Sequence, residues 1–358
     1  MKPKALASLA LGLLAACATA PRWVAPAGMQ SLNRHMVLLP GTYDPEQGDG
    51  QPDGNSVMIR APEGLIVFDT GRHEQAFAGR IIDAAEGWHL PVVAIVNSHW
   101  HLDHVSGNVP LREKYPQSKV YASTAIEDAM QHFLADSRKA AAARLATLPA
   151  DSPEAGYLRA GIARIDAGPK LFPTDPVLSS GSLRIAGMQF RVGLEKNAVS
   201  GGDVWLLDPS TRTLVSGDLV NFPAPFFDTA CPHGWSEALG RLDAQAFDTL
   251  VPGHGAPMTH AQFATYRHAF DQLLACATGN ATVAECAAGW ERDLGPLLPA
   301  DQRKLSRLLL DYYFQSVLRA EPAKRDKYCR AGGGINPRRR ALARVDQSRK
   351  LSNCSGSS

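Results

Sequence analysis

The feature that most limits the fold is a polar motif that directly follows an apolar run. Residues 92–96 read VVAIV, a run without polar side chains that is typical of a strand buried on both faces. Residues 97–108 then read NSHWHLDHVSGN, with three histidines and one aspartate within six positions. With 45% hydrophobic and 20% charged residues among 358, the chain is globular material with enough length for one large core or two small ones. A disordered or fibrous chain is excluded.

Strand patterns dominate before residue 260, and helical patterns are interspersed among them. Residues 56–71 predict a hairpin whose second strand, LIVF, is apolar throughout and ends at Asp69. Further strand patterns lie at 182–194, 203–220 and 247–255, and helical patterns at 76–88, at 124–166 and from 259 onward. Strands paired by hairpins, with helices between them, predict layered sheets covered by helices.

These patterns divide the chain into segments. We expect a signal peptide at 1–16, a tether and N-terminal segment at 17–54, a core at 55–260 with a helical insertion at 124–166, a helical extension at 261–322 and a basic tail at 323–358. From Lys324 to Lys350 the tail has ten Lys and Arg against two Asp, which favours a solvated, disordered segment. Contact of the tail with anionic lipid is the alternative.

The N-terminal residues predict export. Lys2 and Lys4 precede an apolar stretch, residues 5–16, that is too short to span a bilayer and is typical of a secretory signal. The following LLAAC resembles the lipobox of bacterial lipoproteins, which implies that Cys17 is acylated and becomes the first mature residue. Cleavage after ATA, which leaves Pro21 at the terminus, is the alternative. We expect a periplasmic protein that is attached to a bacterial membrane by lipid, and no nucleic-acid partner.

Five cysteines follow the lipobox, and in an oxidising compartment such thiols usually pair. Cys276 and Cys286 lie between two predicted helices, and we predict a disulfide between them. Such a bridge is worth about 2 to 4 kcal/mol. The pairing of Cys231, Cys329 and Cys354 stays open, and Cys354 is the predicted free thiol.

The crowding at residues 99–104 makes chemical sense around metal ions. Histidine nitrogens and carboxylate oxygens are ligands that zinc accepts at about 2.0 to 2.2 Å. Side chains at positions i and i+2 of extended backbone point to the same side, so His99 and His101 can converge on one ion. Asp103 and His104 follow where a helix could begin, and they face a neighbouring position. The motif predicts a two-metal loop, and a surface loop or a hydrogen-bonded core cluster is the alternative.

Four motifs resemble those of the metallo-β-lactamase-fold hydrolases. SHWHLDH is similar to the family's H-x-H-x-D-H signature, VFDTG to its strand that ends in an acid, LVSGDLV to its metal-bridging Asp and VPGHG to its late His. They occur in the family's order over about residues 55–260. The resemblance implies the α+β class, specifically a four-layer αββα sandwich with the metal site at the sheet edge and a helical C-terminal extension.

The resemblance also implies a role for each motif residue. Zinc is the implied cofactor, as one or two ions. The first ion would be held by His99 and His101, the second by Asp103, His104 and His254, and both by the bridging Asp218. Asp69 would support the loop by accepting the free ring N–H of a ligand imidazole.

One family histidine has no counterpart. The family has another His in a GHTPGD-like sequence, where this chain reads GLEKNAVSGGDVW, and alignment on the Gly-Asp pair puts that His at Val199. Valine cannot bind a metal, so the first position keeps only three ligands, whereas the second is complete. Candidate replacements or substrate contacts are Glu195, Asn197, Asp203 and His233, and the sequence does not select among them.

The implied chemistry is hydrolysis of a small molecule. A bound zinc ion lowers the pKa of its water to about 7, and the resulting hydroxide can attack an ester, thioester, lactone or amide carbonyl. Asp103 is placed to orient that nucleophile and relay its proton. Asp218 together with His104 is similar to the glyoxalase II type of general hydrolase. The alternatives are β-lactam hydrolysis, a degenerate site that binds metal without turnover, and iron-dependent sulfur dioxygenation.

Overall fold

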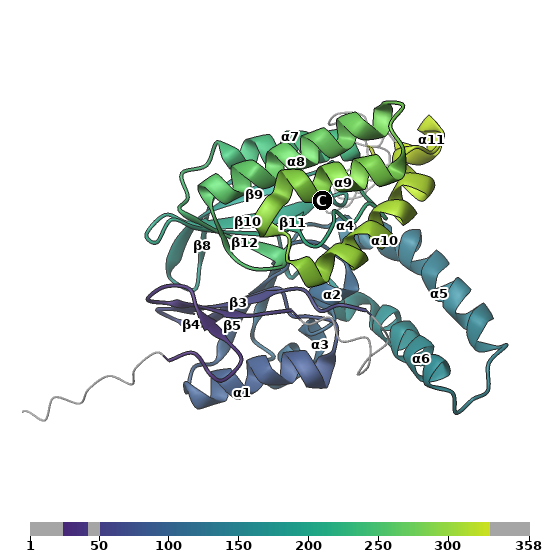
Figure 1. Cartoon of the computed structure of the whole chain (residues 1–358). Coiled ribbons are helices and arrows are strands. Elements are labelled where there is room, and N and C mark those ends of the chain that lie inside the picture. Colours follow the sequence, from purple (N-terminus) through teal and green to yellow (C-terminus); the bar gives the residue numbers. More distant parts are fainter. Residues whose placement is uncertain (1–23, 42–50, 330–358) are drawn as a thin grey trace, which may run out of the picture.

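The protein is described by a computed structural model over residues 24–41 and 51–329. The predicted signal peptide, Cys17, Cys354 and the tail beyond residue 329 lie outside the described residues. Two sheets lie face to face, with α1 and α3 covering the outside of one and α7, α8 and α9 covering the outside of the other (Figure 1). Among the described residues, no helix combines the length and the apolar character needed to cross a membrane. The predicted four-layer sandwich is confirmed.

The first sheet mixes antiparallel and parallel strands. In spatial order it contains β1 (Gln30–Ser31), β2 (Met36–Leu39), β3 (Ser56–Ala61), β4 (Gly64–Phe68), β5 (Val92–Val96), β6 (Lys119–Ala122) and β7 (Asp175–Pro176). The hairpin between β3 and β4 and the buried strand β5 follow the sequence prediction. From β4 to β7 the neighbours are parallel, so these strands end at the same edge of the sheet.

The second sheet begins and ends with short edge strands. Its order is β13 (Met258–Thr259), β12 (Thr249–His254), β11 (Thr213–Asn221), β10 (Asp203–Asp208), β9 (Met188–Glu195) and β8 (Gly181–Ile185). Its one parallel pair is β11 with β12, and the register of β11 shifts around Gly217. Such a bulge re-aims the side chains next to it, and the residue that follows Gly217 is Asp218.

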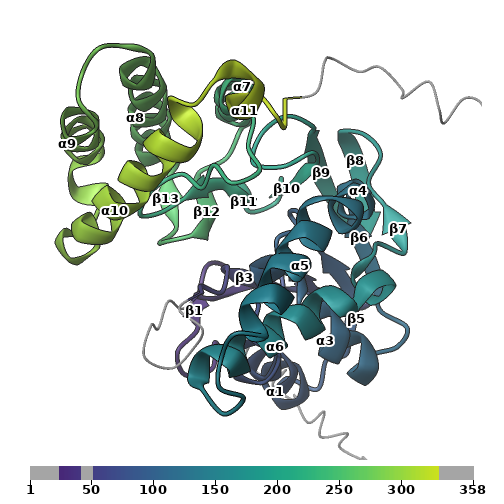
Figure 2. The ribbon, with the colours of Figure 1, turned by 90° about the vertical axis from the view of Figure 1, so that its right-hand side faces the viewer.

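Helices fill the two outer layers and one side of the molecule. They are α1 (Gly79–Gly87), α2 (Leu102–Val105), α3 (Asn108–Lys114), α4 (Ala125–Gln131), α5 (Phe133–Leu145), α6 (Pro153–Asp166), α7 (Pro232–Asp243), α8 (His260–Thr278), α9 (Val283–Leu294), α10 (Arg303–Tyr313) and α11 (Pro322–Arg325), with short 3-10 or π turns between some of them. Figure 2 shows α5 and α6 side by side on the flank of the first sheet, as the predicted helical insertion.

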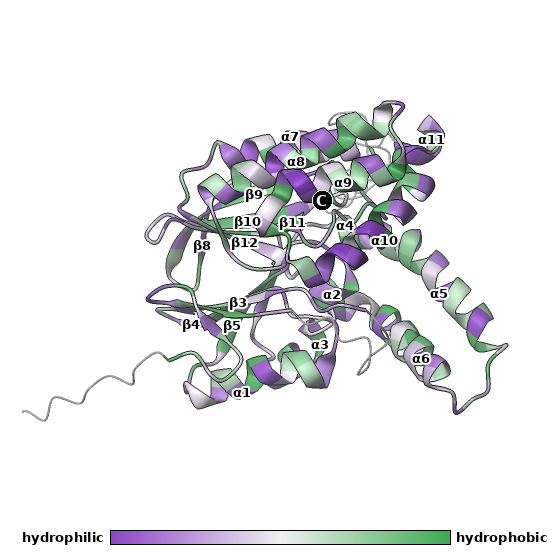
Figure 3. Cartoon of the chain, viewed as in Figure 1, coloured by the Kyte–Doolittle hydropathy of each residue, from purple (hydrophilic) through white to green (hydrophobic). Residues whose placement is uncertain are grey.

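The core is built from the apolar faces of these layers. Inward side chains of both sheets, such as Ile66 and Val96 in one and Phe190 and Leu206 in the other, form a buried cluster between the sheets. A larger cluster joins the outer face of the second sheet to α7–α10. The central strands are mostly hydrophobic, whereas α7–α10 carry both kinds of residue, as amphipathic covering helices do (Figure 3).

Two predicted boundaries need correction. β1 and β2 belong to the first sheet and every residue of Met36–Leu39 is buried, so the core begins well before residue 55. The four apolar residues of β2 are too few to show a periodicity in the sequence. At the other end, residues 323–329 are not part of a disordered tail, because they include the end of α11 and Cys329 forms a disulfide with Cys231.

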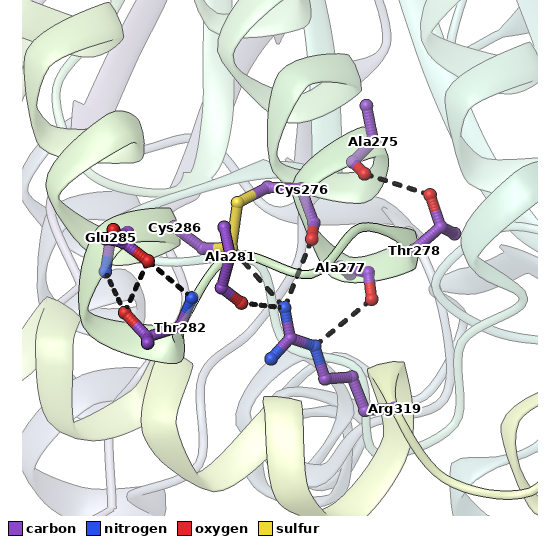
Figure 4. Close-up of a disulfide and its surroundings, with 9 residues drawn as sticks. All are labelled: Ala275, Cys276, Ala277, Thr278, Ala281, Thr282, Glu285, Cys286 and Arg319. Carbon is purple, nitrogen blue, oxygen red and sulfur yellow. Dashed lines mark hydrogen bonds between the residues drawn. A yellow bond between two sulfur atoms is a disulfide. The ribbon is translucent and has the colours of Figure 1, made fainter.

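The C-terminal helices are tied together at one end. Cys276 and Cys286 form the disulfide that was predicted between α8 and α9 (Figure 4). The guanidinium of Arg319 donates to the carbonyl oxygens of Cys276, Ala277 and Ala281 beside that bridge. These carbonyls lie at and just beyond the end of α8, where a helix leaves its last oxygens without partners. The extension is therefore a fixed unit that packs on the second sheet.

Candidate metal centre

The candidate site lies where parallel strands of both sheets end. In the first sheet Asp69 follows β4, His99 lies three residues beyond the end of β5, and α2 begins next. In the second sheet the neighbouring strands β11 and β12 supply Asp218 and His254. The two asparagines of the polar motif lock its ends together, because Asn108 Nδ2 donates to Asn97 Oδ1 over 2.7 Å. The motif is thus a closed loop held at the sheet edge.

Asp69 is the anchor of this loop. Its Oδ1 accepts the backbone N–H of Ser98 over 2.7 Å, and its Oδ2 accepts the Ser98 hydroxyl over 2.7 Å and the Nδ1–H of His104 over 2.8 Å. Asp69 adopts a φ of 56°, a conformation that short polar residues tolerate and that is often found at functional sites. Asp69 thus contacts the ring of His104 as its predicted supporting role requires.

The same network fixes which ring nitrogens are free. The Ser98 hydroxyl has one proton, which it donates to Asp69, so it accepts a hydrogen bond from Nδ1–H of His99 over 2.9 Å. His104 also has its proton on Nδ1. Both rings therefore present the lone pair of Nε2, which is what a metal ligand needs.

Four side chains bring ligand atoms close enough together to surround one metal ion. His104 Nε2 lies 3.1 Å from Asp218 Oδ1 and 3.5 Å from Asp103 Oδ2. His254 Nε2 lies 3.1 Å from Asp103 Oδ2 and 3.5 Å from Asp218 Oδ1. Ligands at 2.0 to 2.2 Å in a tetrahedron are separated by about 3.3 to 3.6 Å. The two 3.5 Å distances lie within that range and the two 3.1 Å distances are slightly shorter, so these four residues can act as ligands of the predicted second metal position.

The predicted first position is less compact. The other oxygen of Asp218, Oδ2, lies 3.8 Å from Nε2 of His99, so the two oxygens of Asp218 face different histidines, as a bridging carboxylate requires. His101 does not belong to either group of three residues whose ligand atoms converge, but its ring lies 4.3 Å from that of His99. The two groups are His99, His104 and Asp218, and Asp103, His104 and His254.

Buried polar atoms at this site have no hydrogen-bond partner within the described part of the chain. They are Nε2 of His99, His104 and His254 and both carboxylate oxygens of Asp218. Leaving such groups buried without partners costs about 1 to 3 kcal/mol each, and more for a charged group. Metal ions at the two positions would together satisfy these five atoms, and the donor set of imidazoles and carboxylates is one that zinc accepts.

The electrostatics of the site favour an added positive charge. Although burial opposes the charged form, the carboxylates of Asp218, Asp103 and Asp69 raise the pKa of His104 well above its ordinary value. Burial also opposes ionisation of Asp103 and Asp218, yet His104 and His254 hold the pKa of both carboxyl groups below the ordinary value. The carboxylates of Asp103 and Asp218 thus favour a cation beside His104 Nε2, and a metal ion supplies that charge without a proton.

Glycines make room for the ligands. A Cβ on Gly54 would lie 2.4 Å from Cε1 of His104, and a Cβ on Gly253 would lie 2.0 Å from Oδ1 of Asp218. Gly217 has a φ of 54°, and a Cβ there would lie 2.2 Å from Cβ of Ser98, so it allows the two sheets to approach beside Asp218. The backbone at these glycines sets the positions of the imidazole and the carboxylate.

The structure brings none of the candidate replacements for the missing histidine into the cluster. Val199 is fully buried among apolar side chains. The carboxylate of Glu195 accepts from Trp205 Nε1 and from Arg241 Nε, so it is engaged on the outside of the second sheet. The carboxylate of Asp203 accepts from the backbone and hydroxyl of Ser200, and burial raises its pKa to about 7.

His233 and Asn197 are not ligands in this arrangement either. His233 is exposed at the start of α7, and the backbone oxygen of Asn197 packs against Gly234. Among the described residues, neither belongs to a group that could hold a metal ion.

Some residues that contact the site were not found from the sequence, among them Ser98 and Thr229. Ser98 stands inside the quoted motif, and its position between a strand end and His99 is a signal that could have identified it. Thr229, whose Oγ1 lies 2.7 Å from His101 Nε2, has no such signal, because it lies 128 positions away in an irregular loop.

Known proteins share this fold and part of this sequence. A linear primary-alkylsulfatase from Pseudomonas sp. is 26% identical over 219 residues, which are 56% of this chain and 41% of that protein, so the chain spans less than half of the relative's length. Among solved structures, an inverting sec-alkylsulfatase from Pseudomonas sp. has 18% identity and a TM-score of 0.55 over 89% of this chain and 57% of its own. A metallo-beta-lactamase from Pontibacter korlensis has 17% identity and a TM-score of 0.51 over 68% of this chain and 98% of its own.

A sequence profile gives the classification. It matches residues 49–254, which include Asp69, the motif at 97–108, Asp218 and His254. These are the residues that the fold gathers at the edge of the two sheets. Since the match covers more than half of the chain, the protein belongs to the metallo-beta-lactamase superfamily.

Proposed function

We propose that this protein is a metal-dependent hydrolase of small molecules. One zinc ion would be held by Asp103, His104, Asp218 and His254, and a second, weaker one by His99, His101 and Asp218. The observation that carries this proposal is a cluster of buried imidazole and carboxylate atoms 3.1 to 3.5 Å apart, in which the histidine Nε2 atoms and both Asp218 oxygens have no hydrogen-bond partner among the described residues. A stabilising core cluster would pair these atoms with each other, whereas a metal site leaves them pointing at one position.

The chemistry of hydrolysis is divided between the ion and the protein. When bound, zinc supplies a Lewis acid that lowers the pKa of water to about 7. Asp103 stays ionised, because His104 and His254 hold its pKa low, so it can accept a hydrogen bond from the attacking water and orient it. Asp69 holds the ring of His104 in the required tautomer.

Two histidine variants test the metal site. His254→Ala removes one of the four tetrahedral ligands and should lower zinc affinity by about 100-fold or more, together with activity. His233→Ala is the matched control, because His233 is exposed and outside the cluster. Zinc affinity is measured by competition with a chelator, and metal content by mass spectrometry. Equal zinc affinity in both variants would contradict the assignment.

The expected substrate class follows from the activated water and from the guanidinium of Arg72. A water activated in this way attacks ester, thioester, lactone and amide carbonyls, which are the expected substrates. Sulfate esters are the second candidate, favoured by the alkylsulfatase relative and by Arg72, whose Nη2 lies 3.7 Å from Asp103 Oδ1 at the rim of the site. A guanidinium fork binds anionic oxygens well. Arg72 would hold the sulfate group or a carboxylate of the substrate.

A substrate panel separates these classes. The zinc-loaded protein is assayed with acyl esters, thioesters, lactones, β-lactams and primary alkyl sulfates. Arg72→Ala should raise KM for anionic substrates more than for neutral ones, and Arg80→Ala on α1 is the control. Activity on carbonyl substrates alone would remove the sulfatase candidate. No activity on any class with a filled metal site would show binding without turnover, and iron as the native metal would favour the oxygenase alternative.

We also propose that the protein is exported and attached to a bacterial membrane through Cys17. The support is the apolar stretch that leads to LLAAC, together with two disulfides, which persist in oxidising compartments. Cell fractionation tests this. The protein should be found with membranes, and Cys17→Ser should release it. A membrane-bound Cys17→Ser variant would refute lipid attachment at this residue.

A further inference from the structure

His101 differs from the other motif histidines because its partner is a hydroxyl group. Nε2 of His101 lies 2.7 Å from Oγ1 of Thr229, and the same Oγ1 donates to the backbone oxygen of Val199 over 2.9 Å. A threonine hydroxyl has one proton, and a carbonyl oxygen can only accept. Since that proton goes to Val199, the hydroxyl must accept the N–H of His101. His101 therefore carries its proton on Nε2, and the lone pair is on Nδ1.

This tautomer is the reverse of the one found at His99 and His104. Those rings donate from Nδ1 to Ser98 and Asp69 and present Nε2. A neutral imidazole can bind a metal only through its unprotonated nitrogen. Thr229 thus decides which nitrogen of His101 is offered.

The position of the hydroxyl is fixed from two sides. Thr229 is 2% exposed. Its loop, residues 222–231, is held by the C-terminal extension, since Pro223 O accepts from Trp290 Nε1 over 3.1 Å and from Ser306 Oγ over 2.9 Å. The loop is further held by two links at its other end, a 2.6 Å hydrogen bond from Tyr313 Oη to Asp228 and the disulfide between Cys231 and Cys329. All of these anchors come from residues beyond 254, outside the segment that matches the superfamily profile.

Val199 has a second role in this arrangement. Its side chain cannot replace the family's histidine, but its backbone oxygen ends the relay that begins at His101. The first metal position therefore lacks one ligand, and the tautomer of another ligand, His101, is fixed by a hydrogen bond. A ligand that is already in the correct tautomer loses less free energy on binding than one that must change it.

We propose that Thr229 is a positioning residue for the metal centre: its hydroxyl, linked to the Val199 carbonyl, holds His101 as the Nε2–H tautomer and leaves Nδ1 for the first metal ion. This inference rests on the proposed metal-dependent function. The C-terminal extension contributes by fixing the loop that carries Thr229. Thr229 touches neither substrate nor metal, and it acts through His101.

The tautomer is tested directly by NMR. In protein with ¹⁵N-labelled histidine, two-bond proton–nitrogen correlations distinguish protonated from unprotonated ring nitrogens, and the His101→Gln variant assigns the His101 signals. We expect a protonated Nε2 in the wild type and in Thr229→Ser, which keeps the hydroxyl. Thr229→Val has the same shape without an acceptor, and it should show protonation on Nδ1 or a mixture. Protonated Nδ1 in the wild type, or an unchanged spectrum in Thr229→Val, would overturn the proposal.

Zinc titration tests the consequence for metal binding. Thr229→Val should lower the zinc affinity of the weaker site by about 10- to 100-fold and leave the affinity of the tighter site unchanged. Thr229→Ser should keep the wild-type affinity at both sites. An unchanged titration in Thr229→Val would overturn the link to the metal. Zinc binding at neither position in the wild type would instead refute the proposed function, while the NMR result on His101 would still stand. If Thr229→Val does not fold, the wild-type spectrum alone decides the tautomer.

Discussion

Replacing Gly54 by alanine should remove His104 from the metal site without altering any ligand. The added Cβ would lie 2.4 Å from Cε1, 2.7 Å from Nδ1 and 2.9 Å from Nε2 of that ring. Ordinary van der Waals contact begins at 3.4 Å, so the ring must retreat by about 1 Å. The backbone cannot yield instead, because Gly54 N–H is bonded to Asp103 O and the next residue, Asn55, is bonded to Gly253 and Pro252.

A displacement of 1 Å far exceeds the tolerance of metal coordination, which is about 0.2 Å in ligand distance. The second metal position would keep three of its four ligands. We expect zinc affinity to fall by about 100-fold or more, which corresponds to about 2.8 kcal/mol. The metal-free protein should lose about 1 to 3 kcal/mol of stability from overpacking.

The measurement is chelator competition, with thermal unfolding of the metal-free protein in parallel. Gly161→Ala on α6 is the matched control, because a Cβ there meets nothing within 4 Å and alanine favours a helix. It should leave zinc affinity unchanged. Wild-type affinity in Gly54→Ala would refute the reasoning, because it would show that His104 does not bind the ion in the position that the structure gives it.

Three further variants test the support of the site and the fold. Asp69→Asn replaces one carboxylate oxygen by an NH2 group that cannot accept the Nδ1–H of His104, so zinc affinity in chelator competition should fall by about 10- to 100-fold. Unchanged affinity would refute the supporting role of Asp69. Burial opposes ionisation of Asp208, but its hydrogen bond with His35 holds the pKa of the Asp208 carboxyl below the ordinary value. The ionised carboxylate therefore stabilises the fold above about pH 4, and this stabilisation is lost as the pH falls further. Asp208→Asn should therefore cost about 1 to 3 kcal/mol in urea unfolding at neutral pH, with a difference from wild type that narrows in acid, and a pH-independent difference would contradict this. Replacing Cys276 and Cys286 by serine should cost about 2 to 3 kcal/mol of stability with unchanged zinc content, and loss of zinc would show that the extension reaches the site more directly than described.

Local patterns were enough to predict layered sheets and the metal-binding character of residues 97–108, whereas the four-layer order and the candidate roles of Asp218 and His254 came from the resemblance to a known family. A continuous apolar run specifies a buried strand, and the polar residues that follow it must emerge at the strand's end, as His99 and Asp69 do. The hairpin turns and the helical insertion also follow from periodicity within short windows. The valine at position 199, where the family has a histidine, was noticed only through the resemblance to the family's motif.

The remaining features depend on contacts between distant segments. The link from Thr229 to His101 spans 128 positions and the disulfide from Cys231 to Cys329 spans 98, and neither leaves a periodic pattern in the sequence. The same is true of β2, whose four residues gain their place only by pairing with β3. The tautomer of each ring also depends on its partner, so the sequence could propose His101 as a ligand but not which nitrogen it would present.

The central claim is that side chains from both sheets hold a metal ion at the strand ends. Anomalous diffraction at the zinc edge from crystals of the zinc-loaded protein tests it most directly. We predict an ion within about 2.0 to 2.2 Å of Nε2 of His104 and His254 and of one oxygen each of Asp103 and Asp218. A zinc-loaded crystal with no anomalous peak among these atoms, or with its peaks elsewhere on the protein, would contradict the account.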